Sequence, residues 1–332
     1  MGVAQTKRTS AYSKPPWIFK GSALYQLHLV KAETARAFIP KEFRLVEAFG
    51  YTLGGFFLAN YEDSPAGPFD ELVVIAGLVW NPPTSCAPQK SEIYHGSTLE
   101  IYFQHDMEHL VFLFGGTKSC MKWAARVLVS SDDACDHGRK EVGLPSHVAK
   151  FSKRTASIPR KQKSINNCFL EMIGLETAPS RPDDRMDVQV TEINSNSTTS
   201  ICNINFATAV PGLNSDKWMG PKINMSLPSF SGRTEYNPNL LKYSCDMECR
   251  VRAVQPARVL SAPKVDAEES FSKTADSVTG GLLDNGQNLS ISVMLSKPIL
   301  ALEFSCLKMQ VKAPTVVSDC YKTPGRTSLG VS

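Results

Sequence analysis

Apolar residues in this chain gather in short runs that turn-forming residues separate, which is the pattern of a protein built mostly from β-strands. Residues 72–80 form an almost continuous apolar run, LVVIAGLVW, whose length suits a strand buried on both faces. Residues 23–30 and 51–61 are also rich in strand-forming residues, and a Gly54-Gly55 pair interrupts the second stretch. Further strands are predicted over residues 123–130, 201–210, 223–227, 249–260 and 289–307.

Helical patterns are rare by comparison. Residues 32–38 suit a short helix that Pro40 brings to an end. The segment SPAGPFDE at residues 64–71 is typical of a rigid turn between two strands. Because strands dominate and the connections between them are long, we predict an α+β fold whose sheet is mostly antiparallel and curved or closed.

Composition narrows the class of protein without indicating its chemistry. The chain has 332 residues, of which 42% are hydrophobic and 20% charged, so it can bury a core and is not a disordered chain. Its formal net charge of +4 is too small to indicate a nucleic acid partner. Uninterrupted apolar runs stay well short of the about 18 residues that a membrane crossing needs, so we expect no transmembrane segment.

Cysteine usage predicts an intracellular protein with reduced thiols. The chain has nine cysteines, an odd number, and no secretory leader precedes them. No two of them form a Cys-x-x-Cys pair, so the spacing of a structural zinc site is absent. An H-x-x-E-H pattern at residues 105–109 lies between stretches that are poor helix formers, and it lacks a third ligand. We therefore expect neither a metal nor another cofactor.

The amino-terminal residues 1–14 are predicted to form a flexible, basic tail. Gly2 and Thr6 fit the N-myristoylation pattern, with Lys7 and Arg8 behind them, but a pattern this short more often marks a solvated tail. The segment is not a clear transit peptide. The cytoplasm and the plastid therefore stand as alternative locations.

Residues 88–122 interrupt an otherwise coherent pair of strands. Without them, Ala87 would be followed directly by Trp123, and the apolar pattern would run on. We interpret the segment as an insertion or a retained intron, and its LVFLF end is what a pyrimidine-rich stretch would encode. Sequencing the transcript tests this interpretation.

Several motifs, in this order and at this spacing, resemble the acetoacetate decarboxylase-like superfamily. They are PPW at residues 15–17, SPAGPFDE at 64–71, HGRKEVGLP at 137–145 and WMGP at 218–221. More closely, residues 12–61 resemble the plant neoxanthin-deficient family almost without interruption. The resemblance implies a cone-shaped, mostly antiparallel β-barrel with flanking helices over residues 15–265. Residues 266–312 would then add a strand extension, and residues 313–332 a disordered tail.

The same resemblance implies a lysine nucleophile that this chain lacks at the matching position. In the superfamily a pair of lysines follows a Gly-Arg, four-residue, aromatic-Pro signature, and one of them forms an imine with a ketone. Here Gly138-Arg139 and Leu144-Pro145 are followed by Ser146 and His147. A hydroxyl group cannot form an imine, so Ser146 marks the position of a lost nucleophile and the chain is not predicted to be an active acetoacetate decarboxylase.

Glu71 aligns with a glutamate in the pocket of the superfamily. A carboxylate held there needs either a raised pKa or a cationic partner, and Arg139 and then Arg126 are the partners we expect. The alternative is a buried ion pair that only stabilises the fold. Ser146, His147 and Trp218 complete the set of pocket candidates. Because the other charged pocket groups of the superfamily do not match, we expect an apolar ligand such as a carotenoid, an apocarotenoid or a lipid.

Two functions follow as hypotheses. The resemblance implies a non-catalytic accessory or ligand-binding protein required for neoxanthin, and hence for abscisic acid under drought, with a protein of the carotenoid pathway as a candidate partner. The alternative is a lyase or hydrolase in which Glu71 acts as acid and base and Arg139 orients a carboxylate. The sequence leaves open whether the chain forms an oligomer.

Overall fold

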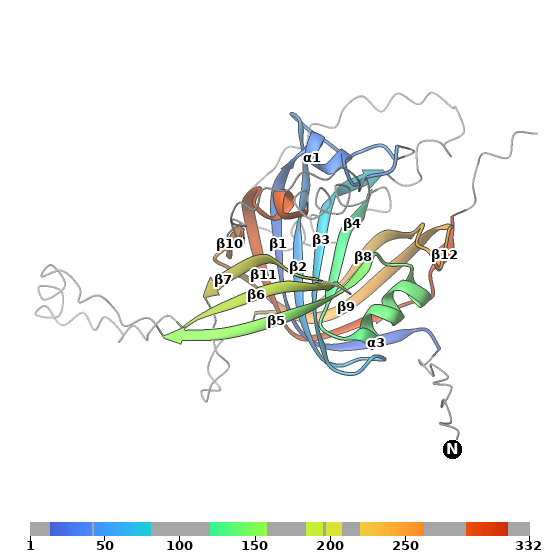
Figure 1. Cartoon of the computed structure of the whole chain (residues 1–332). Coiled ribbons are helices and arrows are strands. Elements are labelled where there is room, and N and C mark those ends of the chain that lie inside the picture. The colour runs from blue at the N-terminus through green and yellow to red at the C-terminus, as the bar shows by residue number, and fades with distance from the viewer. Residues whose placement is uncertain are drawn as a thin grey trace, which may run out of the picture.

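The described part of this computed structural model is a sheet that closes into a barrel and continues into an outer ribbon. It covers residues 14–41, 43–80, 120–157, 184–194, 197–207, 220–261 and 290–317. Seven of the described strands form the barrel (Figure 1). In their order around it they are β1 (Trp17–Lys31), β2 (Tyr51–Asp63), β3 (Phe69–Trp80), β4 (Cys120–Val129), β8 (Lys222–Gly232), β9 (Leu240–Val254) and β11 (Lys297–Val311).

The barrel closes where β8 meets β4. These two strands run parallel, with Lys122 facing Ser229 and Trp123 facing Phe230, whereas the other neighbours in the barrel are antiparallel. The short parallel contact is the only link that the described residues show between the two halves of the wall at this seam. This contact joins the two ends of the sheet into a barrel and gives it a lumen.

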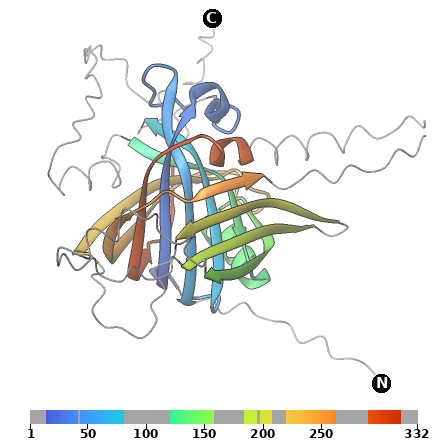
Figure 2. The ribbon, with the colours of Figure 1, turned by 90° about the vertical axis from the view of Figure 1, so that its left-hand side faces the viewer.

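Beyond the seam, β4 changes its neighbour and begins the outer ribbon. Val127–Val129 of β4 pair in parallel with the first residues of β5, so that Val127 faces Ser146. The remaining strands of the ribbon are antiparallel and pass over the outside of the barrel (Figure 2). The ribbon consists of β5 (Ser146–Ser157), β6 (Asp184–Asn194), β7 (Ser197–Ala207) and β10 (Arg258–Ser261).

The barrel strands bury both of their faces, in two separate hydrophobic clusters. Side chains that point into the lumen, such as Tyr25 and Phe304, form the first cluster. Side chains on the outside of the barrel form the second, together with the apolar face of the ribbon. Successive residues of β3 enter different clusters, Val73 the first and Val74 the second, which explains the unbroken apolar run of residues 72–80.

Short helices stand at the two ends of the barrel (Figure 1). At one end, α1 (Ala32–Arg36) follows β1 directly, and residues 290–294 form a further turn of helix. At the other end, α3 (Asp132–His137) begins at Ser131, whose side-chain oxygen accepts a hydrogen bond from the Ala134 amide, and continues into the π-helical turn η2 (Gly138–Val142). Because α3 and η2 contribute residues to the lumen cluster, they cover that end of the barrel.

The expected fold class, an α+β protein with a mostly antiparallel, barrel-like sheet and few helices, is confirmed. Residues 290–294 were predicted as part of a strand and are helical instead, so that β11 begins only at Lys297. Strands β5 and β6 were not predicted, since many of their residues are polar or charged. Alternate residues of β6 are nevertheless buried, among them Val188 and Val190, so the DVQVTEI pattern contained the signal.

The structure also shifts the expected segment boundaries. Cys120–Lys122, the last residues of the presumed insertion, lie in β4 and pair with β3, so they belong to the barrel; residues 88–119 lie outside the described part. The strand expected as a carboxy-terminal extension is β11, which stands in the barrel wall between β1 and β9. A two-residue strand, β12 (Thr315–Val316), then pairs with β9 inside the segment expected to be disordered.

Gly55 is a position where the barrel tolerates no side chain. Its φ is +135°, and a Cβ atom there would lie 2.0 Å from the backbone oxygen of Gln26 in the neighbouring strand. Gly55→Ala is therefore expected to lower the free energy of unfolding by more than the roughly 1–2 kcal/mol that a left-handed conformation alone costs. Gly67→Ala is the matched control, because Gly67 also has a positive φ, +80°, but has nothing within 4 Å of the added carbon. Equal losses for the two variants in chemical denaturation would contradict this account.

Candidate functional site

The lumen of the barrel contains a cavity of about 110 Å³. Its walls are mainly aromatic and aliphatic side chains from the barrel strands, and α3, η2 and the start of β5 border it at one end. A few polar groups interrupt this apolar lining. They are Tyr61, Glu71, Lys122, His137, Ser146, Ser229, Tyr243 and Cys245. A mostly apolar hollow with few polar groups is the usual form of a ligand site.

Glu71 lies on β3 with its carboxyl group in the cavity. The hydroxyl of Tyr61, on β2, donates a hydrogen bond of 3.0 Å to Glu71 Oε2. Burial raises the pKa of the Glu71 carboxyl to about 7, and the hydrogen bond from Tyr61 offsets only part of that effect. Near neutral pH this carboxyl group can therefore both donate and accept a proton, which is the requirement for a general acid or base.

Lys122 brings an amine to the same cavity, from the seam where β4 meets β8. The residue is only 6% exposed, and its Nζ lies 5.5 Å from the centre of the Tyr25 ring. Burial lowers the pKa of the Lys122 amine to about 7, since a charged ammonium loses its hydration in the apolar lumen. Sequence reasoning missed this residue because it assigned Lys122 to the presumed insertion. The signal was a lysine within the otherwise apolar strand CMKWAARVLV.

Cys245 links the surroundings of the acid and the amine. It lies on β9, and burial raises the pKa of its thiol to about 12, so the group stays protonated. The charge of Glu71 raises the pKa of the Cys245 thiol, and the charge of Lys122 lowers it. Both ionisable groups are therefore close enough to the same thiol to influence it, and the cavity contains an acid and an amine that titrate near the same pH.

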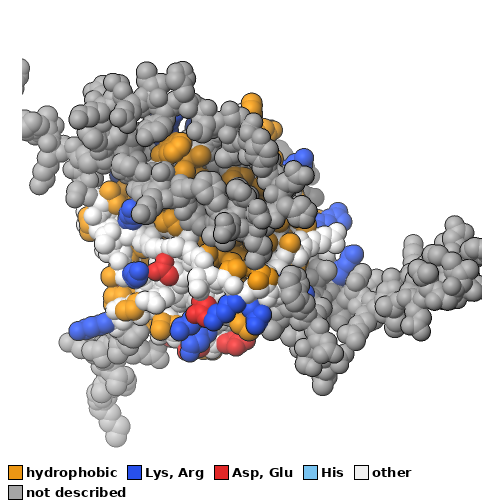
Figure 3. All heavy atoms as spheres, turned by 180° about the vertical axis from the view of Figure 1, so that it is seen from behind, with side chains coloured by type: hydrophobic (Ala, Val, Ile, Leu, Met, Phe, Trp, Pro, Cys, Tyr) orange, Lys and Arg blue, Asp and Glu red, His pale blue; other side chains and the backbone are white. Residues whose placement is uncertain are grey.

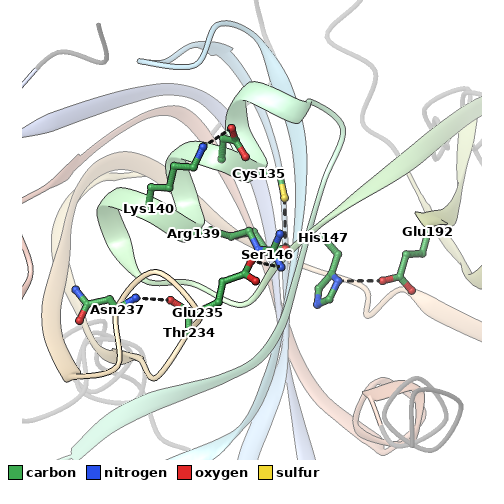
Figure 4. Close-up of polar contacts among 10 residues, drawn as sticks. Cys135, Arg139, Lys140, Ser146, His147, Glu192, Thr234, Glu235 and Asn237 are labelled. Carbon is green, nitrogen blue, oxygen red and sulfur yellow. Dashed lines mark hydrogen bonds and ion pairs between the residues drawn. The ribbon is translucent and has the colours of Figure 1, made fainter. Parts of the chain in front are cut away.

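Ser146, the position expected to have lost a nucleophile, borders the cavity at the beginning of β5. The residue is 1% exposed, and its hydroxyl has no hydrogen-bond partner among the described residues. Gly138 covers it closely, because a Cβ atom at that glycine would lie 2.5 Å from Ser146 Oγ. The thiol of Cys135 donates to the backbone oxygen of Ser146, which anchors β5 beneath α3 (Figure 4).

His147 and Arg126 lie outside the cavity, in an ionic group around the buried Glu192 that joins β4, β5 and β6. Arg126 binds the carboxylate of Glu192. His147 Nδ1 lies 3.3 Å from the same carboxylate (Figure 4). Burial, and then the charge of Arg126, lower the pKa of His147. Because consecutive residues of a strand point to opposite faces, Ser146 and His147 do not face one another, and no nucleophile–base pair forms between them.

Arg139 is not the partner of Glu71. It lies on η2, where its guanidinium group is 3.2 Å from the carboxylate of Glu235, and both side chains are accessible to solvent (Figure 4). The adjacent Gly138 borders the cavity, whereas Arg139 is not in its lining. Consecutive residues of a helical turn point in different directions, so one can face the lumen while the next faces solvent. Trp218, the remaining pocket candidate, lies outside the described residues.

The described residues also bear on three other kinds of site: a metal centre, a nucleic acid surface and a membrane-spanning helix. The described residues contain no group of three or more His, Cys, Asp and Glu side chains placed to hold a metal ion. On the face shown in Figure 3, Lys and Arg side chains lie beside Asp and Glu side chains, whereas nucleic acid favours a surface of one sign. Among the helices that the structure describes, none is long and apolar enough to cross a membrane.

Three curated plant proteins match almost the whole chain. The chain is 57% identical to the protein NEOXANTHIN-DEFICIENT 1 of Solanum lycopersicum over 326 residues, which cover 96% of the chain and 98% of that protein. The chain belongs to the NEOXANTHIN-DEFICIENT 1 family. Family members of the same name from Arabidopsis thaliana and Oryza sativa subsp. japonica are 54% and 49% identical to it, over 96% and 95% of the chain and 99% and 94% of those proteins. No protein-family model matches the chain.

Solved structures similar to this NEOXANTHIN-DEFICIENT 1 family member include an acetoacetate decarboxylase and an enduracididine biosynthesis enzyme. The acetoacetate decarboxylase of Legionella pneumophila is 11% identical, with a TM-score of 0.47 over 92% of this chain and 89% of that chain. The enduracididine biosynthesis enzyme MppR complexed with pyruvate is 14% identical, with a TM-score of 0.46 over 95% of each chain. At this low sequence identity, no residue's role can be carried over from these structures to this chain. The chemistry of the site is therefore argued from the geometry described above.

Glu71 should make the stability of the protein depend on pH. Its pKa is about 7 in the folded state and 4.5 in the ordinary state, so the folded form retains the proton more strongly. The stability that the neutral carboxyl contributes is fully present below pH 4.5 and is lost by about pH 7, a change of up to about 3 kcal/mol. Glu71→Gln, which stays neutral, is expected to remove this slope from free energies of unfolding measured across that range.

Exposed Glu33 provides the control, because Glu33→Gln changes a carboxyl that is not in the cavity. This variant should retain the slope of the unaltered chain. If Glu71→Gln also retains it, the carboxyl of Glu71 is not desolvated in the way that the cavity implies.

Proposed function

We propose that this chain takes part in the formation of neoxanthin, and that it does so by binding a small molecule in the barrel cavity. The first half is supported by its family, whose members are named NEOXANTHIN-DEFICIENT 1. The second half is supported by the cavity itself, a mainly apolar hollow that a few polar groups also line. That cavity is the observation on which the proposal rests.

The size of the cavity changes the ligand that we propose. Its volume of about 110 Å³ is below the roughly 300–1,000 Å³ of pockets that enclose drug-sized molecules. A whole carotenoid, an apocarotenoid or a lipid, which the sequence favoured, is too long to be enclosed there. We therefore propose a small, mostly apolar ligand, and we assign the carotenoid itself to a partner protein of the pathway to which this chain is an accessory.

Further consequences follow from this accessory role. If neoxanthin depends on this chain, then abscisic acid and the response to drought depend on it as well, as the family resemblance implies. The cytoplasm and the plastid stay as the two alternative compartments, and fractionation of plant tissue distinguishes them.

A second candidate function is an enzyme that uses Glu71 as acid and base. It is favoured by the raised pKa of this carboxyl and by the hydrogen bond from Tyr61, which together place a titrating group in an apolar cavity. The version of this hypothesis that includes Arg139 is not retained, since Arg139 pairs with Glu235 outside the cavity.

Filling the cavity should abolish the function while the fold persists. Ala124 borders the cavity, so Ala124→Leu places three further carbon atoms in it. In a plant line that lacks neoxanthin because its own family member is absent, this variant is expected to restore less than a tenth of the neoxanthin that the unaltered chain restores, as measured by pigment chromatography. Ala37→Leu makes the same change at an exposed position and should restore neoxanthin fully. Thermal melts verify that both variants fold, and full restoration by folded Ala124→Leu would refute ligand binding in the cavity.

The acid–base hypothesis has its own test in the same plant line. Glu71→Gln keeps the shape of the side chain and can still accept the hydrogen bond from Tyr61, but it cannot transfer a proton. An accessory protein should tolerate this change, so we expect neoxanthin to be restored to within about twofold of the level reached with the unaltered chain. Loss of neoxanthin with a folded Glu71→Gln chain would instead support the enzyme.

A further inference from the structure

Lys122 places a nucleophilic group in the lumen at a position that the sequence motifs did not indicate. Those motifs directed attention to Ser146, on β5. The register between the two strands sets Val127 of β4 beside Ser146, and Lys122 lies five residues before Val127 on β4. The amine therefore comes from the neighbouring strand and from the barrel seam, opposite Ser229.

We propose that Lys122 binds a small, uncharged aldehyde or ketone covalently, as an imine, within the barrel cavity. This inference rests on the proposed function and deepens it, because it names the chemical class of the ligand. Two observations carry it: the amine borders the cavity in the barrel lumen, and that cavity is mainly apolar.

The surroundings of Lys122 favour the reactive form of its amine. Only the neutral amine has a free electron pair, and with a pKa of about 7 about half of the Lys122 side chains are neutral at pH 7. Exposed lysines of the described chain differ in their surroundings. Lys20 and Lys140, for example, reach into solvent and lie 2.8 and 2.7 Å from the carboxylates of Asp63 and Asp136.

The bond changes balance without any additional reagent. The electron pair of the neutral Nζ attacks the carbonyl carbon and forms a C–N bond, while the electrons of the carbonyl double bond move to oxygen. That oxygen takes one proton from the nitrogen and one from a hydronium ion of the solvent, and leaves as water. The products are a protonated imine on Lys122 and two water molecules, one from the carbonyl oxygen and one from the hydronium ion.

The lining of the cavity selects the ligand. Its volume of about 110 Å³ is somewhat smaller than the roughly 150 Å³ of an apolar cavity that holds benzene, so about five or six non-hydrogen atoms fit. No arginine is among the described residues that line it, and an ionised Glu71 repels an anion. A small uncharged carbonyl compound therefore fits better than a keto acid.

The experiment captures the imine by reduction. The full chain is incubated at pH 7 with butanone and sodium cyanoborohydride, which converts an imine into a stable secondary amine, and the modified residues are located by peptide mass spectrometry. We expect one butyl group per chain, on Lys122, formed at least ten times faster than on Lys20 or Lys140. The rate should rise with pH and reach half of its maximum near pH 7. Modification of Lys122 at or below the level of the exposed lysines overturns the proposal.

Two variants test whether the imine forms on Lys122 and whether it forms inside the cavity. Lys122→Arg keeps a long cationic side chain but cannot form this imine, so the butyl group should disappear. Ala124→Leu keeps the amine and fills the cavity, so the rate should fall at least tenfold. Lys140→Arg is the matched control at an exposed site and should leave labelling of Lys122 unchanged. Labelling of Lys122 that persists in Ala124→Leu means that the cavity does not hold the ligand, and overturns the proposal.

Restoration of neoxanthin in the deficient plant separates this inference from the function on which it rests. If Lys122 is labelled but Ala124→Leu restores neoxanthin fully, imine formation stands and the proposed function fails. If Lys122 is not labelled and Ala124→Leu still abolishes neoxanthin, the cavity is required but the ligand is not held as an imine, so the inference fails alone.

Discussion

The pairing of β4 with β8 is the contact on which the site depends. Two residue pairs complete a barrel whose other strands are joined by long antiparallel ladders. Because the barrel is closed, its lumen is separated from water, and the inward side chains lose their hydration. The shifted pKa values of Glu71 and Lys122 have burial as their largest cause, so they follow from this closure and not from a strong local ion pair.

Glu71 and Lys122, which line one apolar cavity, make the free energy of unfolding depend on pH in different ranges, the acid below about pH 7 and the amine above it. Glu71 resists losing its proton below about pH 7, whereas Lys122 gives up its proton at about pH 7, well below the usual 10.5. In the folded state, the neutral forms of both groups are thus available together near neutrality. A fold that needed only packing at these positions would be served as well by apolar side chains of similar size, because burying ionisable groups costs free energy.

Part of this arrangement can be predicted from the sequence, and the reasons for the rest are physical. The apolar run of residues 72–80 indicated a strand buried on both faces, and the turn before it placed Glu71 at the start of that strand. The orientation of Arg139 depends on a π-helical turn, which no spacing rule for ordinary helices anticipates. Lys122 was missed because the strand predicted from the sequence began only at Trp123, after the presumed insertion, and the barrel that gives the strand an inner face is completed by pairing over a long sequence distance, from β4 to β8. Such pairing is not encoded in any local pattern.

The edge of β4 that pairs with β8 at the seam also pairs with β5 farther along, so one strand belongs to both the barrel and the ribbon. The backbone that holds Lys122 in the lumen is therefore continuous with the residues that anchor the ribbon of β5, β6 and β7. Between the two contacts, residues 124–126 have neither neighbour on that edge, and this short span takes up the difference in direction between the sheets. The outside of the molecule and its enclosed chemistry are in this way mechanically connected through a few peptide bonds.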